Sequence, residues 1–200
     1  MRDASQVYLS QAGQLLVVPG ADPETFSVIS SGGACGNYFG RDARHVYDGT
    51  NPLTKDIGGS TISDDIYSTA EPSSFQLLYS ANGACSYYEK DSRTVFYQDS
   101  FVANADPASF TALSNPFYAK DKQRVYYKGQ FINWAQPDSF VPLGANYAKD
   151  ASRVYHSNPG SALTDVVSGA DLATFSIVQG NPNFDAEDKN YKYLNGRMVQ

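Results

Sequence analysis

The chain repeats one short pattern, Asp-x-x-x-Val-Tyr, along its whole length. The copies, of which the third has Phe in place of Tyr and the sixth is degenerate, begin at Asp3, Asp42, Asp91, Asp121, Asp150 and Asp188. The closest copies are about thirty residues apart, and the others carry insertions. A unit this short cannot bury its own apolar face, so neighbouring copies must stack. The repeat therefore predicts one repeat domain over residues 1–200, with units that start near residues 1, 35, 85, 116, 146 and 183.

The residues around each repeated Asp are typical of a β-hairpin. In residues 117–132, two short aromatic and β-branched runs flank the polar segment Lys120-Asp121-Lys122-Gln123. We expect the Asp to hold this turn by accepting backbone N–H groups two residues on. Lys128-Gly129 then predicts a second turn into a further strand. The 15 Tyr and 11 Phe residues of the chain agree with a fold built from strands.

A second pattern, Ala-Asp-Pro-x-Ser-Phe, occurs between the Asp copies. Its five versions occupy residues 21–26, 70–75, 105–110, 135–140 and 170–175. Asp as N-cap followed by Pro predicts a single helical turn, with the Phe entering the core. The predicted fold is therefore mainly β, a repeat array of β-hairpin units with short single-turn helices between them. We expect the array to be open rather than a closed propeller, because neither end of the chain supplies an obvious missing strand to the other.

The charge and hydrophobicity of the chain restrict the kinds of molecule that it can bind. Fifteen Lys and Arg against 21 Asp and Glu give a net charge of -6, which repels nucleic acid and suits a basic protein partner. No run of 18 or more apolar residues occurs, so no transmembrane segment is expected. The first residues lack the charged and apolar regions of a signal peptide, and Met1 resembles an added start, so we expect a signal peptide to have been removed.

The sixth copy resembles the bacterial DKNYY repeat family, which is named after such a sequence: it reads Asp188-Lys189-Asn190-Tyr191-Lys192-Tyr193. Residues 118–127 are the copy that keeps the pattern best. The resemblance covers nearly the whole chain. It implies a bacterial and exported protein, and it supplies no catalytic residues that could be transferred to this sequence. Some short repeat proteins of this general kind neutralise toxins, which suggests an immunity protein as one hypothesis.

The two cysteines, Cys35 and Cys85, follow Ala at corresponding places in neighbouring copies. If adjacent units stack in parallel, these positions approach each other, and a disulfide would join copies two and three. Such a bond would indicate an oxidising compartment such as the periplasm. Two buried free thiols are the alternative. A catalytic or metal-ligating pair is disfavoured, because no further ligands lie nearby in the sequence.

The candidate binding residues lie where the copies differ. The insertion 48–65 contains acidic and amide side chains that suit either a solvated binding loop or a Ca²⁺ site, although the spacing fits no EF-hand: Asp48, Asn51, Asp56, Asp64 and Asp65. A second insertion spans residues 156–166, and His156 at its start is a further candidate for the binding surface. Tyr97, Tyr127 and Trp134 are candidates for an exposed aromatic face, with a place in the core as the alternative for each. His45 and His156 are expected on strand surfaces, with a paired histidine site as the alternative.

No catalytic motif is present: the sequence has no Gly-x-Ser-x-Gly, phosphate-binding glycine loop or His-Glu-x-x-His. The repeated Asp residues are better explained as turn formers than as catalytic acids. We therefore expect a non-enzymatic envelope protein, periplasmic or otherwise exported, that needs no cofactor and binds another protein such as a basic toxin or effector. A carbohydrate- or cell-wall-binding module is the alternative, and an enzyme would require a cleft with converging acids.

Overall fold

The computed structural model describes residues 1–31, 38–52, 70–79, 85–98, 100–144 and 146–199. Throughout these ranges the regular elements are β-strands, and none is a helix. The described residues accordingly contain no helix with the length and apolar character that crossing a membrane requires. The β-rich class predicted from the sequence is confirmed.

The strands form six antiparallel sheets, one of two strands and five of four, and none of these sheets closes on itself. The two-stranded sheet contains β1 (Tyr8–Gln11) and β2 (Gln14–Val17). The four-stranded sheets contain, in chain order, β3 (Ser27–Ser31), β4 (Tyr38–Arg41), β5 (Val46–Asp48) and β6 (Asn51–Pro52); β7 (Gln76–Tyr79), β8 (Cys85–Lys90), β9 (Val95–Tyr97) and β10 (Ser100–Phe101); β11 (Thr111–Ala112), β12 (Tyr118–Lys120), β13 (Val125–Tyr127) and β14 (Gln130–Phe131); β15 (Val141–Gly144), β16 (Tyr147–Lys149), β17 (Val154–Ser157) and β18 (Thr164–Val166); and β19 (Ser176–Ile177), β20 (Ala186–Glu187), β21 (Lys192–Leu194) and β22 (Arg197–Met198).

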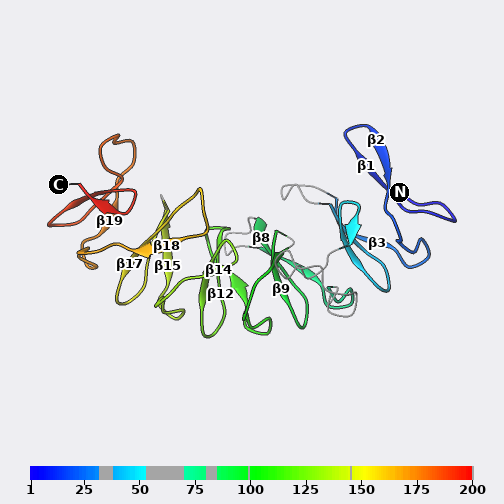
Figure 1. Ribbon diagram of the computed structural model, residues 1–200, viewed down its shortest axis with the longest axis horizontal. Helices are drawn as coiled ribbons and strands as arrows, with labels where there is room; N and C mark the ends of the chain where they lie inside the picture. The colour runs from blue at the N-terminus through cyan, green and yellow to red at the C-terminus, as the bar shows by residue number, and fades with distance from the viewer. Residues whose placement is uncertain (32–37, 53–69, 80–84, 99, 145, 200) are drawn as a thin grey trace. The chain divides into compact units, whose positions relative to one another are not determined.

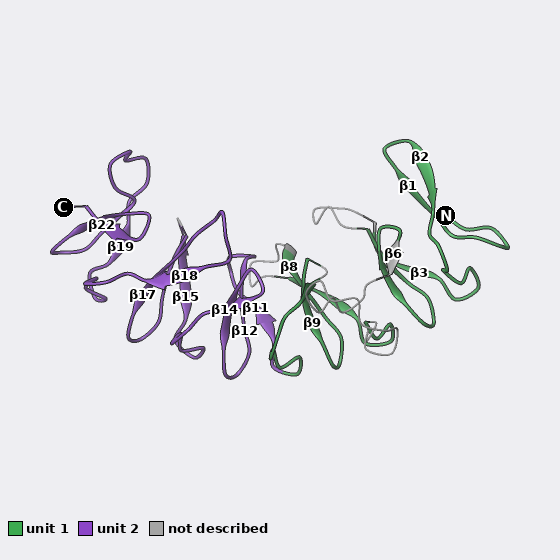
Figure 2. Cartoon of the chain, in the orientation of Figure 1, with its two compact units in different colours: residues 1–79, 83–108 green, residues 80–82, 109–200 purple. Residues whose placement is uncertain are grey.

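The chain divides into two compact units (Figure 2). The first comprises residues 1–79 and 83–108, and the second residues 80–82 and 109–200. Both units are built from the same repeated sheet.

Each four-stranded sheet is a meander whose strands follow one another in chain order (Figure 1). The sheet of copy four is the clearest example. Its middle strands, β12 and β13, form the hairpin predicted around Asp121, with Tyr118 opposite Tyr127. The predicted second turn is also present, with positive φ angles of 48° at Lys128 and 75° at Gly129. The first strand, β11, directly follows Phe110 of the second pattern, so each sheet starts at that Phe.

The repeated Asp residues hold the hairpin turns as predicted. In all six copies, Oδ1 accepts N–H bonds from the residues two and three positions on, at 2.6–2.8 Å. In five copies, Oδ2 also accepts the hydroxyl of the Tyr five positions on, at 2.7–2.9 Å. The third copy has Phe96 at that position. The Asp side chain thus bonds both the turn and the second strand of its own hairpin.

The second pattern forms a hydrogen-bonded turn but no helix, so the predicted single-turn helices are wrong. The Phe26 N–H bonds to the Asp22 carbonyl at 3.0 Å, and Phe175 makes the same bond to Asp171. The capping chemistry is present, since Oδ1 of Asp171 accepts the N–H of Thr174 at 3.1 Å. The strand begins directly after each Phe, so no residues remain to propagate the turn, and an isolated turn gains too few bonds to count as helix.

The two sequence patterns are parts of one structural unit. In four copies, Oδ2 of the repeated Asp accepts the backbone N–H of the second residue of the preceding second pattern, at 2.7–3.0 Å. In return, the Ser or Thr of that second pattern accepts the N–H of the residue after the Asp, at 3.0–3.1 Å in all five cases. The turn of the second pattern and the following Asp hairpin, 12 to 20 residues apart, are therefore bonded in both directions.

In copies two, three and four, the basic residue before the Asp bonds to the second pattern that follows it in the chain. Lys120 Nζ donates to the carbonyl of Pro137 at 2.7 Å, and Lys90 Nζ does the same to Pro107 at 2.8 Å. Arg41 makes the corresponding bond to Pro72 at 2.7 Å. Each of these bonds joins a sheet to the turn of the second pattern that follows it.

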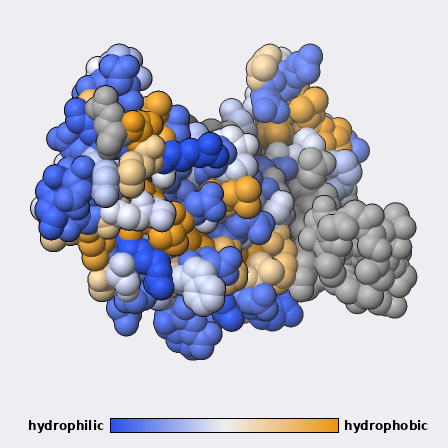
Figure 3. All heavy atoms as spheres, turned by 60° about the vertical axis from the view of Figure 1, so that its left-hand side comes forward, coloured by the Kyte–Doolittle hydropathy of each residue, from blue (hydrophilic) through white to orange (hydrophobic). Residues whose placement is uncertain are grey.

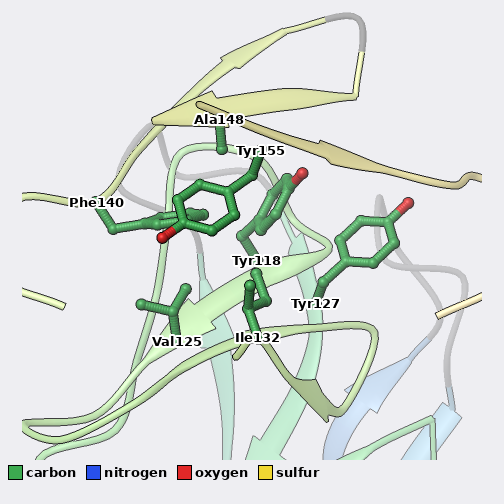
Figure 4. Close-up of a cluster of buried hydrophobic side chains, with 7 residues drawn as sticks. All are labelled: Tyr118, Val125, Tyr127, Ile132, Phe140, Ala148 and Tyr155. Atoms are coloured by element: carbon green, nitrogen blue, oxygen red, sulfur yellow. The ribbon is translucent and has the colours of Figure 1, made fainter. Parts of the chain in front are cut away.

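The apolar core lies between consecutive copies. In the second compact unit, one cluster of buried side chains combines residues of copies four and five (Figure 4): Tyr118, Val125, Tyr127, Ile132, Phe140, Ala148 and Tyr155. The ring of Phe140, from the second pattern, lies between Tyr118 and Tyr155, with centroids 5.6 and 5.7 Å away. The stacking of neighbouring copies that the sequence predicts is therefore present within this unit.

Candidate functional site: the turn at Trp134

The predicted exposed aromatic face contains one of its three proposed members. Tyr97 and Tyr127 are buried, so their assignment to a binding surface is wrong and the core alternative holds for both. Their rings pack on Tyr88 and Tyr118, at centroid distances of 4.9 and 4.8 Å. β9 and β13 are middle strands whose faces are both covered, which buries successive residues rather than alternate ones.

Trp134 is the exposed member, with 74% of its surface accessible to solvent. It is the third residue of a four-residue turn in which the Ala135 N–H donates to the Ile132 carbonyl at 3.4 Å. Its φ angle is +67°, in the left-handed region. Such a turn normally has Gly or Asn at this position, because these residues tolerate positive φ.

The other copies have the expected residue at the matching position. They have Gly20, Asn104 and Gly169, with φ angles of 74°, 59° and 79°. Only copy four places a large aromatic side chain there among the described copies. The left-handed conformation costs a residue with a β-carbon roughly 1–2 kcal/mol, and an exposed indole gains little burial in return.

Copy five holds the backbone of this turn. The carbonyl oxygen of Trp134 accepts the hydroxyl of Tyr155 at 3.2 Å and Nη1 of Arg153 at 3.3 Å. Tyr155 is itself fixed by its bond to Oδ2 of Asp150 at 2.7 Å. The indole is therefore presented to solvent from an anchored turn, which reduces the conformational entropy lost on binding.

Other apolar side chains near Trp134 in the sequence are also exposed. Phe131 on β14 and Val141 on β15 have 52% and 51% of their surface accessible. Figure 3 shows apolar groups interrupted by hydrophilic residues on the face that it presents. We name Phe131, Trp134 and Val141 together the Trp134 segment.

The unusual position of Trp134 can be found in the sequence if the copies are aligned on the second pattern and the residue just before that pattern is compared. The column there contains Gly20, Asn104, Trp134 and Gly169. Gly and Asn at corresponding positions indicate a positive φ. The anomaly is the Trp in that column, whereas a search for exposed aromatics alone does not separate Trp134 from Tyr127.

The insertion 48–65 is described only in its first residues. Asp48 is half-buried at the end of β5 and pairs with Phe39 on one side and Asn51 on the other. The backbone of Asn51 belongs to β6, and its side chain lies outside the described part. Asp56, Asp64 and Asp65 lie outside the described residues, as does the proposed Ca²⁺ loop that contains them. In the described part of the chain, no group of three or more His, Cys, Asp or Glu side chains is arranged to hold a metal ion.

The proposed cysteine pair also falls on residues that the structure does not describe. Cys35 lies outside the described ranges, and for Cys85 only the backbone is described, at the start of β8 opposite Tyr79.

The two histidines occupy different surroundings. His45 is partly exposed in the hairpin turn of copy two, with Nδ1 3.8 Å from Oδ1 of Asp42. His156 is half-buried on β17, and its ring meets that of Tyr147 edge-on at 4.8 Å. Burial lowers the pKa of His156, although Asp185 and Asp165 act in the opposite direction.

Comparison with known proteins identifies a family for this chain. A model of the DKNYY family matches residues 1–159, which include the first five repeated Asp residues and four of the second patterns. No curated protein and no solved structure matches the chain. The family match covers more than half of the chain, and the chain belongs to the DKNYY family.

Proposed function

We propose that this chain is a non-enzymatic bacterial envelope protein that binds another protein through a surface that includes the Trp134 segment. One observation supports this most directly. Trp134 combines a left-handed backbone with an exposed indole, at a position where the other described copies have Gly or Asn. Strained residues of this kind concentrate at functional sites, where the strain is offset elsewhere.

The chemistry of the segment suits a protein partner. Tryptophan is the residue type most enriched among side chains that contribute strongly to protein–protein binding, and such side chains are surrounded by less important contacts that exclude water. Exposed Phe131 would supply such a contact. The net charge of -6 favours a partner with a basic face and increases its rate of association. A secreted basic toxin, neutralised by this chain as an immunity protein, is the partner we propose.

The test compares two substitutions of Trp134 with a control. Full-length protein is immobilised and exposed to envelope extracts, and any protein retained is purified and titrated. We expect saturable binding that Trp134→Ala and Trp134→Gly weaken at least tenfold, because both remove the indole. Leu163→Ala, which removes another exposed apolar side chain, serves as the control and should bind normally. Absence of a saturable partner, or equal binding by all three variants, would argue against the proposal.

A carbohydrate- or cell-wall-binding module is the second candidate, favoured by the same exposed indole, whose flat apolar face can stack on a sugar ring. Trp134 is the only tryptophan in the chain, so its fluorescence reports this site alone. Titration with soluble glycans and peptidoglycan fragments would shift the emission if they bind there. Flat titrations would dismiss this candidate.

We further propose that the sheets succeed one another as an open array and that the protein is exported to the periplasm. In that compartment Cys35 and Cys85 would be joined as a disulfide. Mass spectrometry of peptides from non-reduced protein, purified from its native compartment, tests the bond. Recovery of both thiols in free form would contradict it.

A further inference from the structure

A recess lies between the hairpins of copies five and six, away from the Trp134 turn in the sequence. Two adjoining hollows of about 440 and 710 Å³ share five lining residues, His156, Asp165, Asn195, Arg197 and Met198. We name this hollow the His156 recess. It forms where copy five departs from copy four. His156 occupies the position of Tyr127, and eight residues separate it from its partner Asp165, whereas two separate Tyr127 from its partner Gln130.

The strand pairing and the hairpin of copy six fix the walls of the recess. His156 on β17 lies directly opposite Asp165 on β18, so their side chains share one face of the sheet. The β21–β22 hairpin packs against His156 at Gly196, where an added β-carbon would lie 2.6 Å from Cβ of His156. The Gly196 N–H donates to the hydroxyl of Tyr147 at 2.8 Å, which holds the hairpin in place.

Two charged side chains line the recess and are open to solvent, Asp165 and Arg197. Nε2 of His156 has no hydrogen-bond partner within the described residues, but it is enclosed by the protein and offers no surface to the recess. Within the described residues, the side chains of Asp165 and Arg197 make neither an ion pair nor a hydrogen bond, although both line the recess.

The recess combines a carboxylate, a guanidinium and an apolar side chain. These groups together suit a ligand that carries one positive charge, one negative charge and an apolar part. Arg197 can bind a carboxylate with two parallel N–H bonds, and Asp165 can bind an ammonium group. Met198, which is 47% exposed, offers a flexible apolar contact for an aliphatic side chain. A ligand with only one charge would leave the other group of the pair unused.

We propose that the His156 recess binds a small zwitterion of the α-amino-acid class, with its carboxylate on Arg197 and its ammonium group on Asp165. The ligand could be a free amino acid, which carries both charges on one carbon, or a whole short peptide, which carries them at its two ends. The inference uses no residue of the Trp134 segment, so it stands or falls separately from the proposed protein partner.

The test is isothermal titration of the full-length chain with L-leucine and with its two singly charged analogues. Isocaproate lacks the amino group of leucine, and isoamylamine lacks its carboxylate. We expect saturable binding of L-leucine and at least tenfold weaker binding of each analogue. Titration of a dipeptide, Gly-Leu, distinguishes a free amino acid from a peptide as the preferred source. Absence of saturable binding of both L-leucine and Gly-Leu up to about 10 mM would overturn the proposal.

Variants locate the binding. Arg197→Gln and Asp165→Asn should each weaken L-leucine binding at least tenfold, and both residues are exposed, so the fold should tolerate the changes. Arg44→Gln and Asp138→Asn change the same residue types at exposed positions elsewhere and serve as matched controls. Equal affinity for leucine in all four variants, or equal affinity of the wild type for leucine and both analogues, would contradict the assignment.

Discussion

The hydroxyl of Tyr126 donates a 2.8 Å hydrogen bond to Oδ2 of Asp121, five residues earlier, and both side chains are buried. The same carboxylate accepts the N–H groups of Gln123 and Arg124 through its other oxygen. The pair therefore closes the hairpin from both sides. It appears in five of the six copies and explains why Asp and Tyr recur at this spacing.

Removal of this carboxylate should destabilise the protein. Asp121→Ala leaves two backbone N–H groups and a buried hydroxyl without their acceptor, and we expect it to lower the free energy of unfolding by about 3 kcal/mol or more. Urea denaturation followed by circular dichroism measures the change. Asp3→Ala removes the same three bonds at an exposed hairpin, where water can replace the carboxylate, and should cost clearly less. Equal costs would show that burial is not the source of the effect.

Substitution of the anomalous tryptophan should stabilise the fold. Trp134→Gly removes the penalty of a left-handed backbone, and we expect the free energy of unfolding to rise by about 1 kcal/mol. Trp134→Ala retains the β-carbon and should gain much less. Val141→Gly, at an exposed strand position without positive φ, serves as the control and should lose stability. The midpoint of urea denaturation orders the variants, and a destabilised Trp134→Gly would contradict the reading of this turn as strained.

The repeated Asp residues should make the fold sensitive to acid. Burial alone would raise the pKa of Asp150, but the Tyr155 hydroxyl and three backbone N–H groups lower it below the ordinary value of 3.8. A carboxyl whose pKa is lower in the folded than in the unfolded state stabilises the fold above the unfolded pKa, and this contribution is lost as the pH falls through the folded pKa. Asp42 and Asp188 have lowered pKa values for similar reasons.

We therefore expect the free energy of unfolding to fall as the pH drops below about 4, which urea denaturation between pH 7 and pH 3 would show. Asp150→Asn removes one of these groups and should make the decline shallower while lowering stability at pH 7. A pH profile with the same slope in wild type and variant would contradict this account.

A small residue is required where β4 passes over the second pattern of its own sheet. A β-carbon on Gly40 would collide with the ring of Phe26. Gly40→Ala should therefore cost about 1–3 kcal/mol, because the ring must leave its packed position. The matching residue of copy four is Ala119, which is already buried, and Ala119→Gly provides the reciprocal test. It should cost about 1 kcal/mol through lost packing and gained backbone entropy. Unchanged stability of Gly40→Ala would show that Phe26 moves freely.

The hairpins and the role of the repeated Asp were predictable, because turn chemistry is local: Asp121 bonds to groups within five residues of itself. The reciprocal bond was not predictable from spacing alone. Ser109 accepts the N–H of Lys122, thirteen residues away, and only the folded sheet brings them together. The helical turn was predicted from correct capping residues, but the strand that begins after Phe110 leaves no room for it.

In the candidate site, too, the features that could not be predicted are those that depend on more than one copy. Burial of Tyr127 depends on the neighbouring copy that covers its strand, which the sequence of a single unit does not reveal. Exposure of Trp134 depends on the φ angle of a turn, which only the Gly and Asn of the sister copies indicate. The His156 recess depends on Gly196 of the next copy. Features that involve two copies therefore escape a reading that treats each copy separately.

The two-way bonding between the second pattern and the next repeated Asp has a consequence for how such a chain changes length in evolution. A duplication or deletion that breaks the chain between Ser139 and Ala151 would separate an acceptor from its donor and leave Oδ2 of Asp150 without the N–H of Gln136. A break just before a second pattern keeps every such bond within one inherited segment. Recombination should therefore succeed at that boundary, and gene lineages of this architecture should grow and shrink in blocks that begin with the Ala-Asp-Pro turn rather than with the Asp hairpin.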